Sequence, residues 1–147
     1  NANGAAPIWA DMVNLETEVA IDNADLGALA YITNAKVRGK LKGTPKVSST
    51  DSIMVWESND TPLNGYPTWV TNQVSSALSK GGANNLSGIF FGNWADLIIG
   101  MWGVLDLLVD PYTNGASGAV RVIALQDVDI AVRHPQSFAA VLDAVTN

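Results

Sequence analysis

The pattern of hydrophobic and polar positions predicts a helix near the start of the chain. From Pro7 to Asp25, apolar residues recur every three or four positions, which is the spacing of one face of an α-helix. Proline suits the first helical turn, and Gly27 is expected to end the helix in the left-handed conformation. The apolar stripe comprises Ile8, Met12, Leu15 and Val19, widened by Trp9, Val13 and Ala20, and the polar positions include Asp11, Glu16, Glu18 and Asp22.

A strand and a second helix are predicted next. The run ALAYIT (28–33) is short and apolar, as expected of a buried strand. Asn34 is placed to cap a helix over AKVRGKLK (35–42), and Gly43 and Pro45 are expected to stop it.

The rest of the chain predicts strands joined by turns. Segment 75–88 is small, polar and glycine-rich, so we expect a loop there. Strands are expected in IMVWE (53–57), TWVTNQV (68–74), GIFFGNW (88–94), DLIIGMWG (96–103), LDLLVDPY (105–112) and VRVIALQDVDIAVRH (120–134), with a turn at TNGASG (113–118). The strand pieces between 88 and 103 are expected to be buried and interrupted by glycine. A helix followed mostly by strands indicates the α+β class.

Composition excludes several classes of function. Charged residues make up 15% of the 147, well below the usual quarter, which suggests that other molecules cover much of the surface. A formal net charge of −6 argues against nucleic-acid binding as the main task. The absence of cysteine and the single histidine exclude disulfides, thiolate sites and multi-histidine metal sites, and no cofactor is expected. The run at 97–105 is too short to span a bilayer. The chain lacks an initiator methionine, and we expect it to be a piece of a longer protein.

Basic residues concentrate on the second helix. Five of the eight Lys and Arg residues fall between positions 36 and 46, namely Lys36, Arg38, Lys40, Lys42 and Lys46. One interpretation is a solvated helix whose cations lie near its C-terminus, where the helix dipole favours them. The other is a basic contact for an acidic neighbouring subunit, with the acidic first helix as a candidate partner.

The longest strand predicted carries the charged residues most suggestive of a site. Alternation from Val120 to His134 places Arg121, Asp127, Asp129 and Arg133 on one face. A metal site would need more oxygen ligands and no resident cations. We therefore expect these charges to pair along the strand or with a partner strand.

His134 precedes Pro135, where an extended conformation can close the strand. A catalytic histidine would need a nucleophile and an orienting acid nearby. Ser137 is close in sequence, but no nucleophile elbow surrounds it. A structural role is favoured for this stretch.

Two other patterns are weak. GKLKGT (39–44) lacks the spacing of a phosphate-binding loop and does not open a helix. The five tryptophans could line a sugar-binding groove, but their spread across helix and strands favours core packing and subunit contacts. They are Trp9, Trp56, Trp69, Trp94 and Trp102.

The region from Gly88 to Val141 resembles the major capsid proteins of tailed bacteriophages with the Hong Kong 97-type fold, which encapsulin shells share. The matching segments follow the family order: Ile89–Trp94, Gly100–Val104, Arg121–Asp129 and Val132–Phe138, preceded by LNGYPTWVTN (63–72) and ALAYITNAKVRGKLKG (28–43). Asn93 departs from the pattern, because the family often has an acidic residue there, and Asn85–Gly88 lengthens a loop.

The resemblance implies an α+β Hong Kong 97-type capsid fold fragment, roughly the C-terminal half of a subunit. Residues 1–27 would form the spine helix of the peripheral domain. Residues 28–110 would form the axial domain, with a central mixed sheet and flanking helices. Residues 111–147 would be a long peripheral-domain strand and a returning C-terminal segment. The family's first strands, N-terminal arm and extended loop have no counterpart, so no crosslinking residue is carried over.

The function implied is that of a structural shell subunit, not an enzyme. It would self-assemble as a homo-oligomer into an icosahedral phage or prophage capsid, located in the virion and, during assembly, in the bacterial cytoplasm. Other capsid-assembly proteins would be partners of the full-length protein, whereas sequence-specific nucleic acid and membranes would not. Subunit-interface candidates are Lys36, Arg38, Lys40, Lys42, Lys80, Arg121, Asp127, Asp129 and Arg133.

Three alternatives remain. An encapsulin-like compartment shell shares the fold. A small hydrolase would use Asp127, Asp129 and His134. A tail or adhesion module would bind glycans through its tryptophans.

Overall fold

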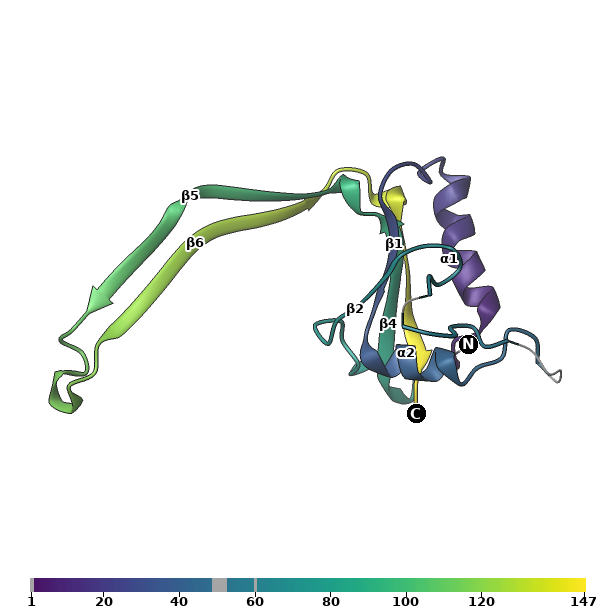
Figure 1. Ribbon diagram of the computed structural model, residues 1–147, viewed down its shortest axis with the longest axis horizontal. Coiled ribbons are helices and arrows are strands. Elements are labelled where there is room, and N and C mark those ends of the chain that lie inside the picture. The colour runs from purple at the N-terminus through teal and green to yellow at the C-terminus, as the bar shows by residue number, and fades with distance from the viewer. Residues whose placement is uncertain (1, 49–52, 60) are drawn as a thin grey trace. The chain divides into compact units, whose positions relative to one another are not determined.

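The computed structural model describes residues 2–48, 53–59 and 61–147. The chain separates into two compact units (Figure 1). The first unit contains Asn1–Asp96 and His134–Asn147, and the second contains Leu97–Arg133.

Helix α1 spans Trp9–Ile21 and is shorter at both ends than the sequence pattern predicts. The backbone N–H of Ile8 donates to Oδ2 of Asp11 at 2.9 Å, so the helix starts after the proline. Asn23 adopts a positive φ of 53° and turns the chain away. The prediction that Gly27 ends the helix is therefore wrong, although Gly27 does have a φ of 101°.

Helix α2 spans Ala35–Lys42, as predicted. The side-chain oxygen of Asn34 accepts a hydrogen bond from the backbone N–H of Val37 at 3.0 Å, which satisfies an otherwise unpaired donor of the first turn. Gly43 forms the C-cap, and its N–H donates to the carbonyl of Lys40.

A mixed sheet of five strands forms the centre of the first unit. Strand β4 (Ala83–Asn93) pairs antiparallel with β1 (Leu29–Thr33), with β3 (Leu78–Lys80) and with β7 (Phe138–Val145). Strand β2 (Thr68–Val70) pairs parallel with β1. The α+β class with a central mixed sheet and two helices is confirmed.

Two local predictions are wrong. Residues 53–57 form no strand, since only Met54 makes a single bridge, to Pro45, while Val55 and Trp56 are buried. Segment 75–88 is not a loop, because β3 and β4 pair across the Gly81–Gly82 turn. The predicted strand at 68–74 shrinks to the three residues of β2.

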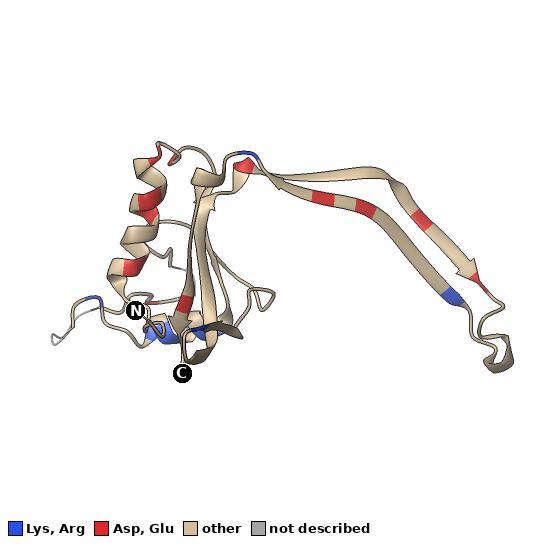
Figure 2. Cartoon of the chain, turned by 180° about the vertical axis from the view of Figure 1, so that it is seen from behind, with Lys and Arg blue, Asp and Glu red and all other residues tan. Residues whose placement is uncertain are grey.

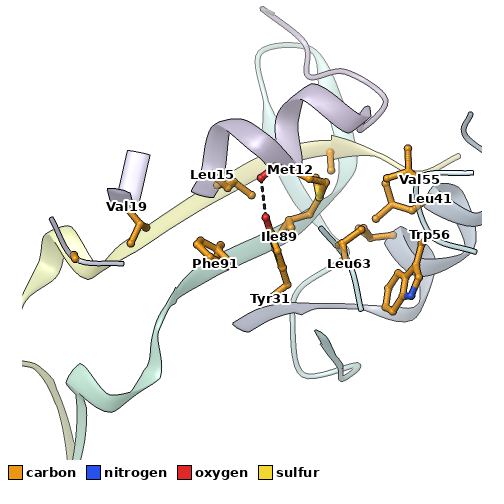
Figure 3. Close-up of a cluster of buried hydrophobic side chains, with 13 residues drawn as sticks. Met12, Leu15, Val19, Tyr31, Leu41, Val55, Trp56, Leu63, Ile89 and Phe91 are labelled. Atoms are coloured by element: carbon orange, nitrogen blue, oxygen red, sulfur yellow. Dashed lines mark hydrogen bonds between the residues drawn. The ribbon is translucent and has the colours of Figure 1, made fainter. Parts of the chain in front are cut away.

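The hydrophobic core lies between the sheet and both helices (Figure 3). Met12, Leu15 and Val19 point from α1 toward Ile89 and Phe91 of β4. The buried members shown are Met12, Leu15, Val19, Tyr31, Leu41, Val55, Trp56, Leu63, Ile89 and Phe91. Burial of these side chains is the main stabilising contribution to the unit.

Tyr31 joins the sheet to α1 by a polar contact inside this core. Its hydroxyl donates to the carbonyl of Met12 at 2.7 Å and accepts from the amide of Asn64 at 3.2 Å. Burial raises the pKa of Tyr31 to about 12, and the hydrogen bond from Asn64 opposes that shift.

We expect stability to fall at alkaline pH through Tyr31. The unfolded phenol ionises near pH 10 and the folded one near 12, so its contribution is complete below pH 10 and is lost as pH rises toward 12. The loss should be about 2–3 kcal/mol at most. Tyr31→Phe should cost about 1 kcal/mol at pH 8, because the Met12 carbonyl loses its donor, and should flatten the decline. Urea unfolding at pH 8 and pH 11 measures both effects, and an unchanged pH slope in the variant would contradict the assignment.

The second unit is a two-stranded antiparallel ribbon. Strand β5 spans Leu97–Asp110 and β6 spans Arg121–Val132, so the long strand predicted at 120–134 is confirmed to within two residues. Short 3-10 helices lie at Trp94–Asp96, at Gly115–Ser117 in the connecting loop and at Pro135–Ser137. Between Trp102 and Asp106 the register shifts, and Gly103 has a φ of 72°. Bulges bend strands, and Figure 1 shows the ribbon bending along its length.

Candidate functional site

One face of the ribbon is apolar and uncovered. Residues paired across an antiparallel ribbon share a face, so the register defines it. The face consists of Leu97–Val132, Ile99–Ile130, Met101–Val128, Leu107–Ala124 and Val109–Val122, each named as a cross-strand pair. Except for the half-buried Leu97, its large side chains are exposed, from Val132 at 44% to Met101 at 68%. The expectation that the strand pieces between 88 and 103 are buried is thus wrong for β5.

This exposure is unfavourable for the ribbon in water. A two-stranded hairpin is at best marginally stable alone, and uncovered apolar area of this kind marks interaction surfaces. Each strand also has one edge without a strand partner within the ribbon, which offers unpaired backbone groups to another chain. The ribbon therefore has the properties of an element completed by further protein.

The register places the ribbon's charged residues on the opposite face, and Figure 2 marks their positions along the two strands. Arg121 is aligned with Asp110, whereas Asp127 lies opposite Trp102 and Asp129 opposite Gly100. Within the described residues of one chain, neither Asp127 nor Asp129 forms an ion pair. The predicted pairing along the strand is wrong for these two aspartates, and pairing with another copy remains a prediction.

The loop at the end of the ribbon is organised by Asp110. Its carboxylate accepts hydrogen bonds from the backbone N–H groups of Tyr112 at 2.9 Å and Thr113 at 3.1 Å, and from the Thr113 hydroxyl. These hydrogen bonds lower the pKa of Asp110, with that from the Thr113 side chain contributing most. The loop is a defined turn, as predicted for 113–118.

The other interface candidates lie in the first unit. Lys36 is exposed, Arg38 is half-buried, and Lys40 donates to the carbonyl of Asn147 at 3.1 Å. Lys42 donates to the side chain of Asn59 at 2.6 Å, and Lys80 forms an ion pair with Asp143. Lys36 is therefore the exposed cation of α2, and the half-buried Lys40 lies about one turn further along the helix. Figure 2 marks where the basic residues fall on α2.

A buried polar network lies where the first unit's chain leaves for β5 and returns from β6. Ser137, 1% exposed, donates to Oδ2 of Asp96 at 2.7 Å, and Asn93 donates to the same oxygen at 3.1 Å. The hydroxyl of Ser137 also lies 2.9 Å from Nδ1 of His134. Because its single proton goes to the carboxylate, Ser137 accepts from His134, whose Nδ1 carries a hydrogen.

This network is not a catalytic triad. In a triad the histidine lies between the serine and the acid and accepts the serine's proton. Here the serine lies between His134 and Asp96, and Nδ1 is a donor. Asp127 and Asp129 belong to the other unit, and the described residues contain no group of three His, Cys, Asp or Glu suited to a metal ion. The geometry gives the hydrolase alternative no support.

We expect Ser137→Ala to destabilise the first unit by about 1–2 kcal/mol, because a buried carboxylate loses a donor. Ser117→Ala is a matched control, since Ser117 also ends a 3-10 helix but is exposed, with its hydroxyl on the carbonyl of Asn114. It should change stability by less than about 0.5 kcal/mol. Urea unfolding followed by tryptophan fluorescence compares the two variants. Equal effects would show that the buried network adds no more stability than the exposed hydrogen bond of Ser117.

The tryptophans do not form one groove. Trp56 is buried in the core, Trp94 donates to the carbonyl of Ala30, and Trp9 lies under Lys46 at 4.4 Å. Trp69 and Trp102 are exposed, on β2 and in the ribbon respectively. Among the described residues, no helix is long and apolar enough to span a membrane.

Sequence reasoning missed two surfaces. The apolar face of β5 was hidden because apolar residues occupy both faces of this strand around the irregularity at 102–106, so no alternation is visible. The other is a groove between α1 and β7 with a volume of about 410 Å³, edged by Asp11, Glu18 and Asp22. The sequence shows the acidic residues along α1, but the opposite wall of the groove is formed by residues 136–141, near the other end of the chain, so the groove could not be predicted.

Solved structures with the same arrangement define the class. The virus-like particle from Pyrococcus furiosus superposes with a TM-score of 0.60 at 16% identity, covering 96% of this chain and 56% of that one. The capsid of an empty GTA particle gives 0.59 at 21%, covering 96% and 49%. Mycobacterium phage Che8 gives 0.61 at 12%, covering 95% and 53%. The fold is the Hong Kong 97-type capsid fold, as predicted.

Sequence comparison identifies the family. The model of the phage capsid family matches residues 1–142. The chain is 33% identical over 130 residues to the major capsid protein of Halomonas phage phiHAP-1, covering 88% of this chain and 19% of that protein. The chain therefore belongs to the phage capsid family. It spans only 19% of this curated relative and about half of each solved structure.

Proposed function

We propose that the chain is part of a structural shell subunit that assembles with copies of itself into a phage or prophage capsid. The observation that carries this proposal is the exposed apolar face of the ribbon, which a free monomer would leave in water. Large permanent interfaces are apolar in this way. Family membership supports the same role and points to a structural protein rather than an enzyme.

The division of the subunit is also proposed. Residues 1–27 would serve as the spine helix, 28–110 as the axial domain, and 111–147 as the long strand and the returning segment. The charged face of the ribbon, with Arg121, Asp127, Asp129 and Arg133, would meet charges of neighbouring copies. Location in the virion, and in the bacterial cytoplasm during assembly, follows from this role, as does contact with other assembly proteins.

An encapsulin-like compartment is the second candidate, because the Pyrococcus furiosus particle shares the fold. The phage role is favoured, since both the family match and the curated relative are phage capsid proteins. Copurification of a defined cargo protein with the assembled particle would favour the compartment.

Sedimentation velocity tests the proposal. The chain should form species larger than the monomer as its concentration rises, and added sulfate should strengthen the association, because it favours apolar burial. Closed particles are not expected from this chain alone in electron micrographs, because it spans only about half the length of the solved shell proteins with this fold. A chain that stays monomeric at millimolar concentration would contradict the proposal.

A further inference from the structure

The groove between α1 and β7 carries negative charge without a cation to balance it among the contacts of the described residues. Glu18 and Asp22 lie on its α1 edge and are exposed, and within the described part of the chain no hydrogen bond or ion pair occupies their carboxylates. Ala139 and Ala140 of β7 form part of the opposite wall. Small side chains on that wall leave room for long side chains from another molecule.

The two carboxylates are placed unfavourably for an isolated helix. Glu18 and Asp22 are four residues apart on the same face, an arrangement in which like charges repel. They also lie at the C-terminal end of α1, where the helix dipole disfavours anions, and the last turn has no basic residue. An external pair of cations would remove both penalties.

The outward face of α2 supplies such a pair. Lys36 and Lys40 are also four residues apart, although Lys40 is half-buried. Gly39 lies beside Lys36, on the side of the helix opposite the buried Val37 and Leu41. The rise between the members of each pair is about 6 Å, so the spacing of the cations matches that of the anions. Lys40 uses one of its three donors on Asn147 and keeps two.

Gly39 is the independent sign that something approaches this face. Glycine inside a helix is destabilising relative to alanine. Nothing lies within 4 Å of a Cβ built at this position, so the folded unit itself does not require glycine. A neighbouring backbone or side chain lying directly on α2 would require it.

We propose that α2 of one copy docks at the α1–β7 groove of the next, with Lys36 and Lys40 against Glu18 and Asp22 and Gly39 at the closest approach. This inference rests on the proposed function and specifies one of its subunit contacts. The two surfaces differ, so the contact is head-to-tail, and repeated contacts of this kind close into a ring when the rotation allows. Figure 2 shows the acidic residues of α1 and the basic residues of α2 gathered at separate places on the first unit.

Charge reversal with rescue tests the pairing. Glu18→Lys and Lys36→Glu should each weaken self-association about tenfold in sedimentation, because like charges then meet. The double variant, which restores opposite charges, should return to within about threefold of the unsubstituted chain. Asp25→Lys, an exposed acid outside the groove, is the matched control and should change association less than about threefold.

Gly39→Ala separates docking from folding. It should make the free chain more resistant to urea but weaken self-association, because the added methyl group holds the surfaces apart. Gly115→Ala, which also adds a Cβ in open space, should leave association unchanged.

Carbodiimide crosslinking of a mixture of light and ¹⁵N-labelled chains locates the contact, because it joins carboxylates to lysines that touch. Links between Lys36 or Lys40 and Glu18 or Asp22 of different copies are expected. Association that persists in both single reversals, with links elsewhere, would overturn this contact and leave the shell proposal standing. A chain that neither associates nor crosslinks between copies would overturn both.

Discussion

Phe91→Ala is expected to lower the free energy of unfolding of the first unit by about 3–5 kcal/mol, which is a large part of the stability of a domain this size. Phe91 is 1% exposed, and its ring centroid lies 4.4 Å from that of Tyr31 and 5.1 Å from that of Tyr66. Truncation would leave a cavity between the sheet and α1, where these aromatic rings cannot collapse without losing their contacts. Urea unfolding followed by tryptophan fluorescence measures the effect.

The neighbouring Phe90 provides the control, because successive residues of a strand point to opposite faces of the sheet. Phe90 is only partly buried and does not belong to the core cluster. Phe90→Ala should cost less than half as much as Phe91→Ala. Equal losses would mean that the two faces of the sheet contribute alike and that the core is not confined to the α1 side.

Features set by neighbouring residues could be predicted from the sequence. The cap of α2 needs only Asn34 and the N–H of Val37, three residues apart, and the prediction of 35–42 is correct. The long strand β6 and its turn follow from β-branched residues and from Gly118, which takes a φ of 68°. Recognition of the capsid fold needed only the order of such segments.

Features set by distant residues could not be predicted. Residues 53–57 look like a strand, but they bury Val55 and Trp56 against α2 instead of pairing within the sheet. The network at the start of the ribbon joins Asp96 to Ser137, which are 41 positions apart. Apolar residues in β5 indicated burial, yet the sequence does not specify whether one chain or several provide it.

Leu107→Asp is expected to weaken self-association about a hundredfold or more while leaving the first unit folded. Leu107 lies on the apolar face of the ribbon, paired with Ala124, and is 62% exposed in the single chain. If another copy covers this face, the variant loses about 1.5–3 kcal/mol of leucine burial and also buries an unpaired charge. Each 1.4 kcal/mol is a factor of about ten in the association constant, so the two penalties together exceed the effect of any single surface charge reversal.

Leu108→Asp is the matched control, because Leu108 is 57% exposed but faces the charged side with Ile123. Sedimentation velocity at matched concentrations compares the two, and urea unfolding checks the first unit. If Leu108→Asp weakens self-association as much as Leu107→Asp does, contacts through the charged face contribute as much to assembly as contacts through the apolar face. That result would contradict a specific role for the apolar face.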